Sequence, residues 1–239
     1  MHARTVQNVL MIRGYTAQQI RAAEAPHLAA REPLMQRAAD GLARHIQDLL
    51  GSRKANRAAR VLLLVGSGDN GGDTLFAGAK LAQAGADTTA LLVGSRAHEA
   101  GWQAAEEAGV SFAAPGRPAE IRRLAASVDL IVDGIVGTGT SANPALRGVA
   151  RDVVEAILAV VTGPNGPVVV AVDIPSGINP DDGSVPDPAV LPATVTVTFG
   201  GIKAGLLIGR GAELAGEVRL VEIGIEGELA SVTPAVEIR

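Results

Sequence analysis

The sequence predicts an α/β fold in which helices cover both faces of an open, mostly parallel sheet. Short apolar runs alternate with amphipathic helical stretches at the spacing of strand–helix–strand units. Residues 168–172 contain only Val and Ala, as a strand covered on both faces requires. The chain has 239 residues, 47% of them hydrophobic, which suits one compact domain.

Composition excludes several classes of function. The net charge of −4 and the aromatic content of 2% disfavour nucleic-acid binding, which needs basic surfaces and rings that stack on bases. Cysteine is absent, which excludes disulfides, thiolate metal sites and a cysteine nucleophile, and fits a reducing compartment. No apolar run reaches the ~18 residues that span a bilayer. We therefore expect a cytoplasmic protein that does not enter membranes.

The first segments in the chain are helical. Residues 1–14 are too short and broken for a signal peptide and are expected to form a leader or disordered arm. Thr16 and Gln19 have the spacing of a capping box, so a helix is expected from Thr16 to near Pro26. Residues 33–50 form a second helix with one apolar stripe, and both helices are expected to wrap the sheet or a partner.

Strands and helices then alternate. The expected strands are 61–65, 88–93, 110–112, 128–133, 168–172, 194–199 and 217–223. The expected helices are one from about residue 73, then 98–108, 118–127 and 148–161. Residues 179–192, rich in Pro, Asp and Gly, are expected to form a loop, and residues 227–239 a tail or linker.

A glycine-rich turn follows the first strand. The run V-L-L-L-V-G-S-G-D-N-G-G-D at 61–73 predicts a loop opened by Gly66, Gly68, Gly71 and Gly72. Its amides and the following helix N-terminus suit an anion, although the pattern is neither G-x-G-x-x-G nor a Walker A loop. The turn also contains Asp69, Asn70 and Asp73. These side chains either cap a tight turn or belong to a ligand site.

Three later strands end in polar segments as well. These are I-V-D-G-I-V-G-T-G-T-S with Asp133, V-A-V-D-I-P-S-G with Asp173 and Ser176, and T-F-G-G-I-K-A-G with Lys203. Taken singly, each is a cap, a turn or a surface amine. Because ligands of open α/β sheets bind at the carboxyl ends of the strands, the four segments together predict one site.

The residue types in this cluster favour an oxygen-liganded cation. With no Cys and only 4 His, a zinc or copper site is disfavoured. Asn70, Asp133 and Ser176 offer one carboxylate and two neutral oxygens, which suit a monovalent ion better than Mg²⁺. Asp69 and Asp173 remain for acid–base chemistry or for hydrogen bonds to ribose hydroxyls.

From Tyr15 to about Ile225 the chain resembles the NAD(P)H-hydrate epimerases, the YjeF N-terminal domain family. The family pattern reads G-P-G-N-N-G-G-D-G, D-A-x-x-G-T-G, D-I-P-S-G and F-G-x-x-K-x-G. Here the corresponding segments read G-S-G-D-N-G-G-D-T, D-G-I-V-G-T-G, D-I-P-S-G and F-G-G-I-K-A-G, and Leu34-Met-Gln-Arg-Ala-Ala39 matches the early helix of the family. The departures are Asp69, Thr74 and Ala204, where the family usually has Asn, Gly and often Pro.

The resemblance implies a Rossmann-like three-layer α/β/α sandwich over residues 15–226, commonly a homodimer. It implies an isomerase that interconverts the R and S epimers of hydrated NADH or NADPH. An ADP- or ATP-dependent dehydratase, fused or separate, would act on the S form. A potassium ion would bind Asn70, Asp133 and Ser176. The substrate would contact Asp69, Asn70, Gly71, Gly72, Asp73, Gly137, Thr138, Gly139, Thr140, Ser141, Ala142, Asn143 and Asp173.

On this reading the catalytic residues are Asp173 and Lys203. Asp173 is the expected proton carrier because it ends a central strand and the cation does not need it. Lys203 positions either the substrate or Asp173. Two other functions are weighed: a non-catalytic nucleotide-binding or scaffold module of the same fold, and a nicotinamide-dependent dehydrogenase. The dehydrogenase is disfavoured because G-x-G-x-x-G is missing. No arginine is assignable to a 2′-phosphate, so NADH and NADPH hydrates are both candidates.

Overall fold

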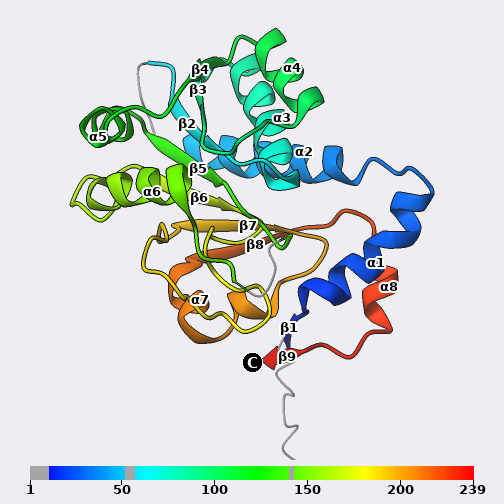
Figure 1. Ribbon diagram of the computed structural model, residues 1–239. Helices are drawn as coiled ribbons and strands as arrows, with labels where there is room; N and C mark the ends of the chain where they lie inside the picture. The colour runs from blue at the N-terminus through cyan, green and yellow to red at the C-terminus, as the bar shows by residue number, and fades with distance from the viewer. Residues whose placement is uncertain (1–10, 52–56, 140–142) are drawn as a thin grey trace, which may run out of the picture.

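The central sheet has seven strands in the order β4-β3-β2-β5-β6-β7-β8, and every neighbouring pair is parallel (Figure 1). The computed structural model describes residues 11–51, 57–139 and 143–239. The strands are β2 Arg60–Val65, β3 Asp87–Leu92, β4 Ser111–Ala113, β5 Leu130–Gly134, β6 Val168–Val172, β7 Val195–Phe199 and β8 Glu217–Val221. The predicted three-layer sandwich with a parallel sheet is confirmed.

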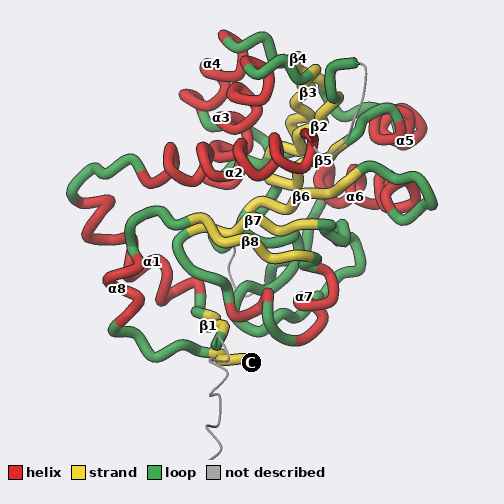
Figure 2. The backbone as a smooth tube through the Cα atoms, turned by 180° about the vertical axis from the view of Figure 1, so that it is seen from behind, coloured by secondary structure: helices red, strands yellow, loops and turns green. Residues whose placement is uncertain are grey.

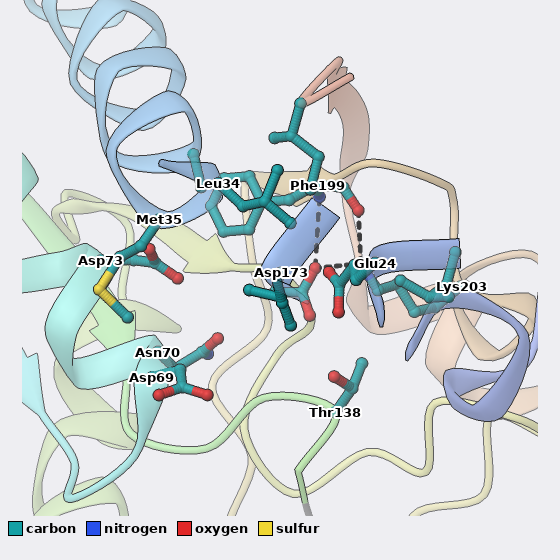
Figure 3. Close-up of a pocket in the computed structure, with 14 residues that line it drawn as sticks. Glu24, Leu34, Met35, Asp69, Asn70, Asp73, Thr138, Asp173, Phe199 and Lys203 are labelled. Carbon is teal, nitrogen blue, oxygen red and sulfur yellow. Dashed lines mark hydrogen bonds and ion pairs between the residues drawn. The ribbon is translucent and has the colours of Figure 1, made fainter. Parts of the chain in front are cut away.

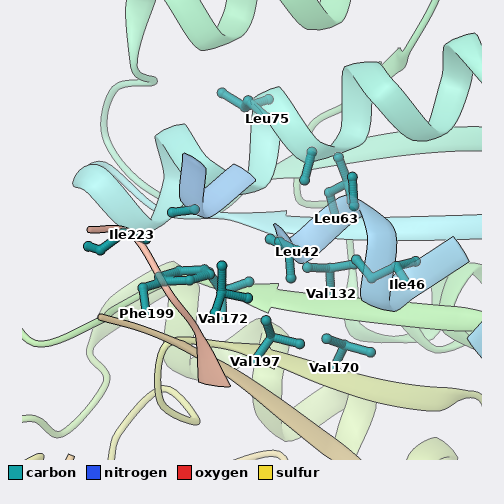
Figure 4. Packing of buried hydrophobic residues seen from close by; sticks show 14 of the residues in the cluster. Leu42, Ile46, Leu63, Leu75, Val132, Val170, Val172, Val197, Phe199 and Ile223 are labelled. Atoms are coloured by element: carbon teal, nitrogen blue, oxygen red, sulfur yellow. The ribbon is translucent and has the colours of Figure 1, made fainter. Parts of the chain in front are cut away.

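Helices cover both faces of the sheet (Figure 1). One face packs against α2 Leu34–Gly51, α3 Asp69–Gln83 and α4 Glu99–Glu107, and the other against α5 Pro118–Ala126 and α6 Gly148–Val161. The alternation along β2 explains the two cores, because Leu63 faces the first group of helices and Leu62 and Leu64 face the second. Figure 4 shows the first core, where Leu42 and Ile46 of α2 lie against Val132 and Val197 of the strands.

The strand order reverses between β2 and β5. The chain runs from β2 outward through β3 to β4, and then from β5 outward through β6 and β7 to β8. At such a reversal the two connections leave in opposite directions and open a crevice at the carboxyl ends of the strands. The glycine-rich turn after β2 and the segment after β5 therefore flank this crevice.

The remaining elements lie beyond the carboxyl ends of the strands or beside β8. They are β1 Ile12–Gly14, α1 Ala17–Ala29, η1 Ala204–Leu206, α7 Gly209–Leu214, α8 Glu226–Ala230 and β9 Val236–Ile238. Figure 2 shows α1 and α8 side by side, away from the sandwich. β1 and β9 pair antiparallel, so parts of the expected arm and tail form a small ribbon, while the domain boundaries themselves stay a prediction.

The expected element boundaries hold within two residues, apart from two helices. Thr16 caps α1 with the predicted capping box, but the helix passes through Pro26 and ends at Ala29, so the predicted end was wrong. Pro26 lies in the third turn, and the helix continues for three more residues with Ala30 N donating to Pro26 O. The second exception, α3, belongs to the site. Among the described residues, no helix is both long and apolar enough to cross a membrane.

Candidate active site at the carboxyl edge of the sheet

Side chains that follow four neighbouring strands meet around one hollow (Figure 3). The hollow has a volume of about 170 Å³ and lies between α1, the first turns of α2 and α3, and the ends of β6 and β7. Its polar lining consists of Glu24, Asp69, Asn70, Asp73, Thr138, Asp173 and Lys203. The predicted convergence at one sheet edge is therefore seen in the structure.

The glycine-rich turn is shorter than predicted. Helix α3 begins at Asp69, directly after its N-cap Gly68, so the expected loop up to Asp73 was wrong. The glycines serve close packing: a Cβ on Gly71 would lie 2.1 Å from Gly66 O, and one on Gly66 would lie 1.8 Å from Ile135 O. The first turn of α3 therefore rests on the backbone that leaves β2 and β5, which brings Asp69 and Asn70 to the hollow.

Asp173 has an unusual backbone conformation. Its φ is +69°, although it is not a glycine. Ile174 N donates to Val172 O at 2.8 Å, so Asp173 is the central residue of a γ-turn of the rare, strained form. A strained residue of this kind persists only where its surroundings hold it, which is common at functional sites. Here Asn70 Nδ2 also donates to Val172 O, at 2.7 Å, and stabilises the turn.

Asp173 forms a buried ion pair with Lys203. The Lys203 ammonium donates to Asp173 Oδ1 and to Phe199 O, the latter at 2.9 Å, and the lysine is only 1% exposed. Thr198 Oγ1 and Phe199 N also donate to Oδ1, at 3.2 and 3.3 Å. Asp173 Oδ2 accepts no hydrogen bond from the described residues, and Asp173 lines the hollow. One oxygen thus fixes the carboxylate and the other is free for a ligand.

Asp133 and Ser176 form a second buried pair. Ser176 N donates to Asp133 Oδ2 at 2.9 Å, and Ser176 Oγ donates to Oδ1 at 2.6 Å. Asp133 is fully buried, and within the described part of the chain no Lys, Arg or His forms an ion pair with it. Burial raises its pKa, although its hydrogen bonds with Ser176 and Ile135 oppose this. Neither residue of the pair lines the hollow.

Asn70 reaches the same region from α3. A Cβ on Gly137 would lie 2.4 Å from Asn70 Oδ1, and one on Gly134 would lie 3.1 Å from Asn70 O. The side-chain oxygen of Asn70 therefore lies against the segment that follows Asp133. The structure brings the three predicted cation ligands to neighbouring positions, with Asp133 and Ser176 in direct contact.

Asp73 is a buried carboxyl of the hollow. It is 7% exposed, and its Oδ1 has no hydrogen-bond partner among the described residues. Burial, and then the nearby Asp173 and Asp69 carboxylates, raise the pKa of Asp73 well above its usual range, while Lys203 opposes this shift. Asp73 therefore keeps its proton to a higher pH than an exposed aspartate does, and the protonated carboxyl can donate a hydrogen bond.

Sequence reasoning missed Glu24, which lies on α1 and faces the same hollow. Burial raises the pKa of Glu24, and the Lys203 charge lowers it again in part. No motif marks this residue, because it lies on a helix that was expected only to wrap the sheet or a partner. Arg21 on the same helix was also missed, and its Nη1 donates to Thr138 O at 3.1 Å.

A larger hollow of about 810 Å³ adjoins the first and shares five lining residues with it, which are Glu24, Leu28, Asp69, Asn70 and Thr138. It runs over residues 66–70 and along 135–139 and 143–147, and its lining includes Arg21 and Arg147. Because they share these residues, the two hollows are treated as two parts of one cleft. The small part holds the acidic groups and Lys203, and the large part has guanidinium groups at its wall.

The predicted substrate contacts fall into three groups. Asp69, Asn70, Asp73, Gly137, Thr138, Gly139, Asn143 and Asp173 line the cleft. Gly71 and Gly72 lie behind this lining, Gly71 against Gly66 O and Gly72 against the His98 ring. Thr140, Ser141 and Ala142 lie outside the described residues. The binding roles of all these residues stay predictions.

Comparison with known proteins identifies close relatives. The family described as YjeF-related protein N-terminus matches residues 31–205. The NAD(P)H-hydrate epimerase of Clavibacter michiganensis subsp. michiganensis is 51% identical over 229 residues, which cover 95% of this chain and 96% of that protein. The NAD(P)H-hydrate epimerase of Microbacterium testaceum is 46% identical, over 94% of this chain and 84% of its own.

Longer relatives and solved structures are also similar. The bifunctional NAD(P)H-hydrate repair enzyme of Mycobacterium tuberculosis is 41% identical over 89% of this chain but only 41% of its own length. The crystal structure of the yeast protein ynu0 (YNL200c) superposes with a TM-score of 0.71, at 20% identity, and covers 84% of this chain and 86% of that one. This structural likeness shows the shared fold.

Proposed function

The chain belongs to the family of YjeF-related protein N-termini, and we propose on that premise that it is an NAD(P)H-hydrate epimerase. It is an isomerase that interconverts the R and S epimers of hydrated NADH or NADPH. The observation that carries the assignment is the convergence of Asp173, Lys203 and the α3 N-terminus on one cleft, in a chain whose relatives at 46–51% identity bear this name.

The shape of the cleft suggests how the substrate lies. A dinucleotide is long, with one reacting ring and a charged diphosphate at its centre. The small hollow, with Asp173 and Lys203, suits the reacting ring. The larger hollow suits the rest, because Arg21, Arg147 and the α3 N-terminus favour the diphosphate. These groups also offset the negative charge that Asp69 places there.

Asp173 carries the proton in this mechanism. The hydroxyl on C6 of the hydrate is next to ring nitrogen N1, so the compound is a hemiaminal. Protonation lets the hydroxyl leave as water, while the N1 electron pair forms a C=N bond. Water that returns to the other face inverts the centre. Asp173 Oδ2, which has no partner in the described structure, is placed to exchange protons with the leaving or arriving oxygen.

Lys203 supports Asp173 in this scheme. Its ammonium fixes Oδ1 and compensates the carboxylate charge in a buried setting, where an unpaired charge is costly. The nearby carboxylates also stabilise the transient positive charge on the ring. Lys203 is thus a positioning residue, because its own amine is occupied by Asp173 Oδ1 and Phe199 O.

We further propose that Asn70, Asp133 and Ser176 hold a potassium ion. The support is the fully buried Asp133 carboxylate, which has no ionised partner in the described part of the chain, since buried charges are normally paired or bound to a metal. One carboxylate with neutral oxygens suits a monovalent cation. When bound, the ion would neutralise this charge and hold together α3, the end of β5 and the segment after β6.

The wider setting is also a proposal. A dehydratase specific for the S epimer would consume the product, in keeping with the bifunctional name of the Mycobacterium tuberculosis relative. We propose a cytoplasmic homodimer, because reduced nicotinamide cofactors are used there and the exposed residues Leu28 and Leu220 offer apolar contacts.

The proposed function is tested with purified protein and the separated R epimer of hydrated NADH. Chromatography should show the S epimer accumulating to equilibrium much faster than in buffer or with heat-denatured protein. The same assay with hydrated NADPH ranks the two substrates. Equal rates with and without protein, for both compounds, would refute the assignment.

A further inference from the structure

Glu24 is a carboxyl of the reaction hollow that neither the sequence motifs nor the relatives' names assign. Helix α1 turns one face to the hollow, with Ile20, Glu24 and Leu28 at helical spacing. Glu24 is half-buried and forms no hydrogen bond or ion pair with another described residue. Figure 3 shows its carboxylate beside Asp173 and Lys203. A half-buried carboxyl without a partner, aimed into a polar hollow, is free to meet a ligand.

Helix α1 is held firmly at its start. Tyr15 N donates to Ile202 O and Ala204 N donates to Tyr15 O, both at 2.8 Å, so the backbone before α1 pairs on both sides of Lys203. Asp181 Oδ1 accepts from Ala17 N at 2.6 Å, which satisfies an amide of the first turn. These hydrogen bonds fix the start of α1, and with it the position of Glu24, relative to Lys203.

The charges around Glu24 come from four elements. Arg21 lies on α1 itself, Asp69 and Asp73 on α3, Asp173 after β6 and Lys203 after β7. Burial dominates and raises the pKa of Glu24, Asp173 and Asp69 add to this, and Lys203 and Arg21 oppose it. Asp173, in contrast, touches the Lys203 ammonium directly. Two carboxyls in different environments are the usual arrangement for an acid and a base.

Inversion at one carbon requires proton transfer on two faces of the ring. We propose that Glu24 is the second acid–base residue and serves the face of the substrate opposite to Asp173. This inference rests on the proposed epimerase function. Asp173 reaches the hollow from the sheet edge and Glu24 from α1, so the two carboxyls come to it from different elements. The proposal requires the substrate ring to bind between them.

The proposed step balances as follows. Glu24 gives its proton to the C6 hydroxyl oxygen, the C6–O bond breaks, and the N1 electron pair forms the C=N bond. A water molecule then attacks C6 from the Asp173 side, forms the new C6–O bond and gives its proton to Asp173 Oδ2. The reverse direction exchanges the two roles, and proton exchange with water at the cleft restores the starting state.

The test compares Glu24→Gln with the wild type and with Glu106→Gln, which removes the same charge from an exposed site on α4. We expect Glu24→Gln to lower kcat by about 10²–10⁴. KM should change by less than about threefold, because the shape of the side chain is kept. The bell-shaped pH profile of kcat/KM should lose one limb. Glu106→Gln should behave like the wild type.

A second variant guards against a merely structural effect. Glu24→Ala opens space at the cleft, and added formate should restore part of its activity in proportion to concentration, while Glu24→Asp should retain an intermediate rate. Wild-type kcat in Glu24→Gln, or loss of activity with no formate rescue and an unchanged pH profile, would overturn the inference. Inactivity of the wild type itself would instead refute the proposed function.

Discussion

At the scale of single residues, the site depends on side chains that are costly in isolation. Asp173 has a positive φ, Lys203 is buried, and Asp73 and Asp133 are buried carboxyls. Each such feature costs on the order of 1–3 kcal/mol unless its surroundings compensate it. For Asp173 and Lys203, their mutual contact and those of Asp173 with Thr198 and Phe199 N provide that compensation. Such concentrated cost at one sheet edge is typical of a functional site.

Asp73 gives a prediction about pH. Burial raises the pKa of Asp73 well above its usual range, so the folded chain binds this proton more tightly than the unfolded chain. Its contribution to stability is therefore full below about pH 4 and is lost as the pH rises through the raised native pKa. Asp73→Asn does not titrate. We expect the melting temperature of this variant, relative to wild type, to increase from acidic to neutral pH.

The control for this prediction is Asp152→Asn, which removes an exposed carboxylate from α6. Its melting temperature should follow that of the wild type at every pH. A difference between the melting temperatures of Asp73→Asn and wild type that stays constant with pH would contradict the account of a buried Asp73 with a raised pKa.

The sequence could predict the polar residues that follow strands. Asp133 and Asp173 come directly after apolar residues of their strands, and Lys203 comes four residues after the end of β7. The parallel sheet brings such positions to one edge. Glu24 and Arg21 could not be predicted in this way. The sequence does not show which side of α1 faces the cleft. The placement of this helix depends on hydrogen bonds of Tyr15 and Asp181 that form only in the folded protein.

At the scale of elements, the two misplaced helix boundaries have physical causes. Glycines usually indicate loops, but Gly71 and Gly72 belong to α3 because backbone and the His98 ring lie where their side chains would be. Pro26 usually ends a helix, yet α1 continues to Ala29. For α3, close packing outweighs the local preference of glycine for loops. For α1, the backbone keeps its helical hydrogen bonding after Pro26, with Ala30 N donating to Pro26 O. The alternating strands and helices of the sandwich, in contrast, follow from hydrophobic pattern alone.

The close approach of α3 to the strand ends gives a second prediction. Gly71→Ala places a methyl group 2.1 Å from Gly66 O, and backbone cannot easily move away. We expect a loss of about 1–3 kcal/mol in the free energy of unfolding, measured with urea, because overpacking outweighs the better helix propensity of Ala. Gly51→Ala in α2 is the matched control, since Gly51 also lies in a helix and no atom lies within 4 Å of its Cβ position. Equal stability of the two variants would contradict this packing.

At the scale of the whole molecule, the order of the strands in the sheet determines where the site lies. The strand order reverses between β2 and β5, and the segments that leave β2, β5, β6 and β7 meet there with α1, which precedes the sheet in the chain. No single motif forms the cleft. The cation proposal makes the same point, because Asn70 lies in α3, Asp133 near the end of β5 and Ser176 in the segment after β6.

The cation gives a third prediction. At equal ionic strength, KCl should raise the melting temperature above that in LiCl, by roughly 2–4 °C for each kcal/mol of binding free energy. Asp133→Asn should abolish the difference between the two salts, because it removes the buried charge. Identical melting temperatures of the wild type in both salts would argue against the cation site.

The central claim is that Asp173, held by Lys203 at the sheet edge, exchanges the proton during inversion of hydrated NADH or NADPH. The most direct measurement is the rate at which Asp173→Asn interconverts the R and S epimers, with circular dichroism to verify its fold. We expect kcat to fall by about 10²–10⁴ while KM stays close to that of the wild type. A folded Asp173→Asn protein that interconverts the epimers at the wild-type rate would contradict the claim.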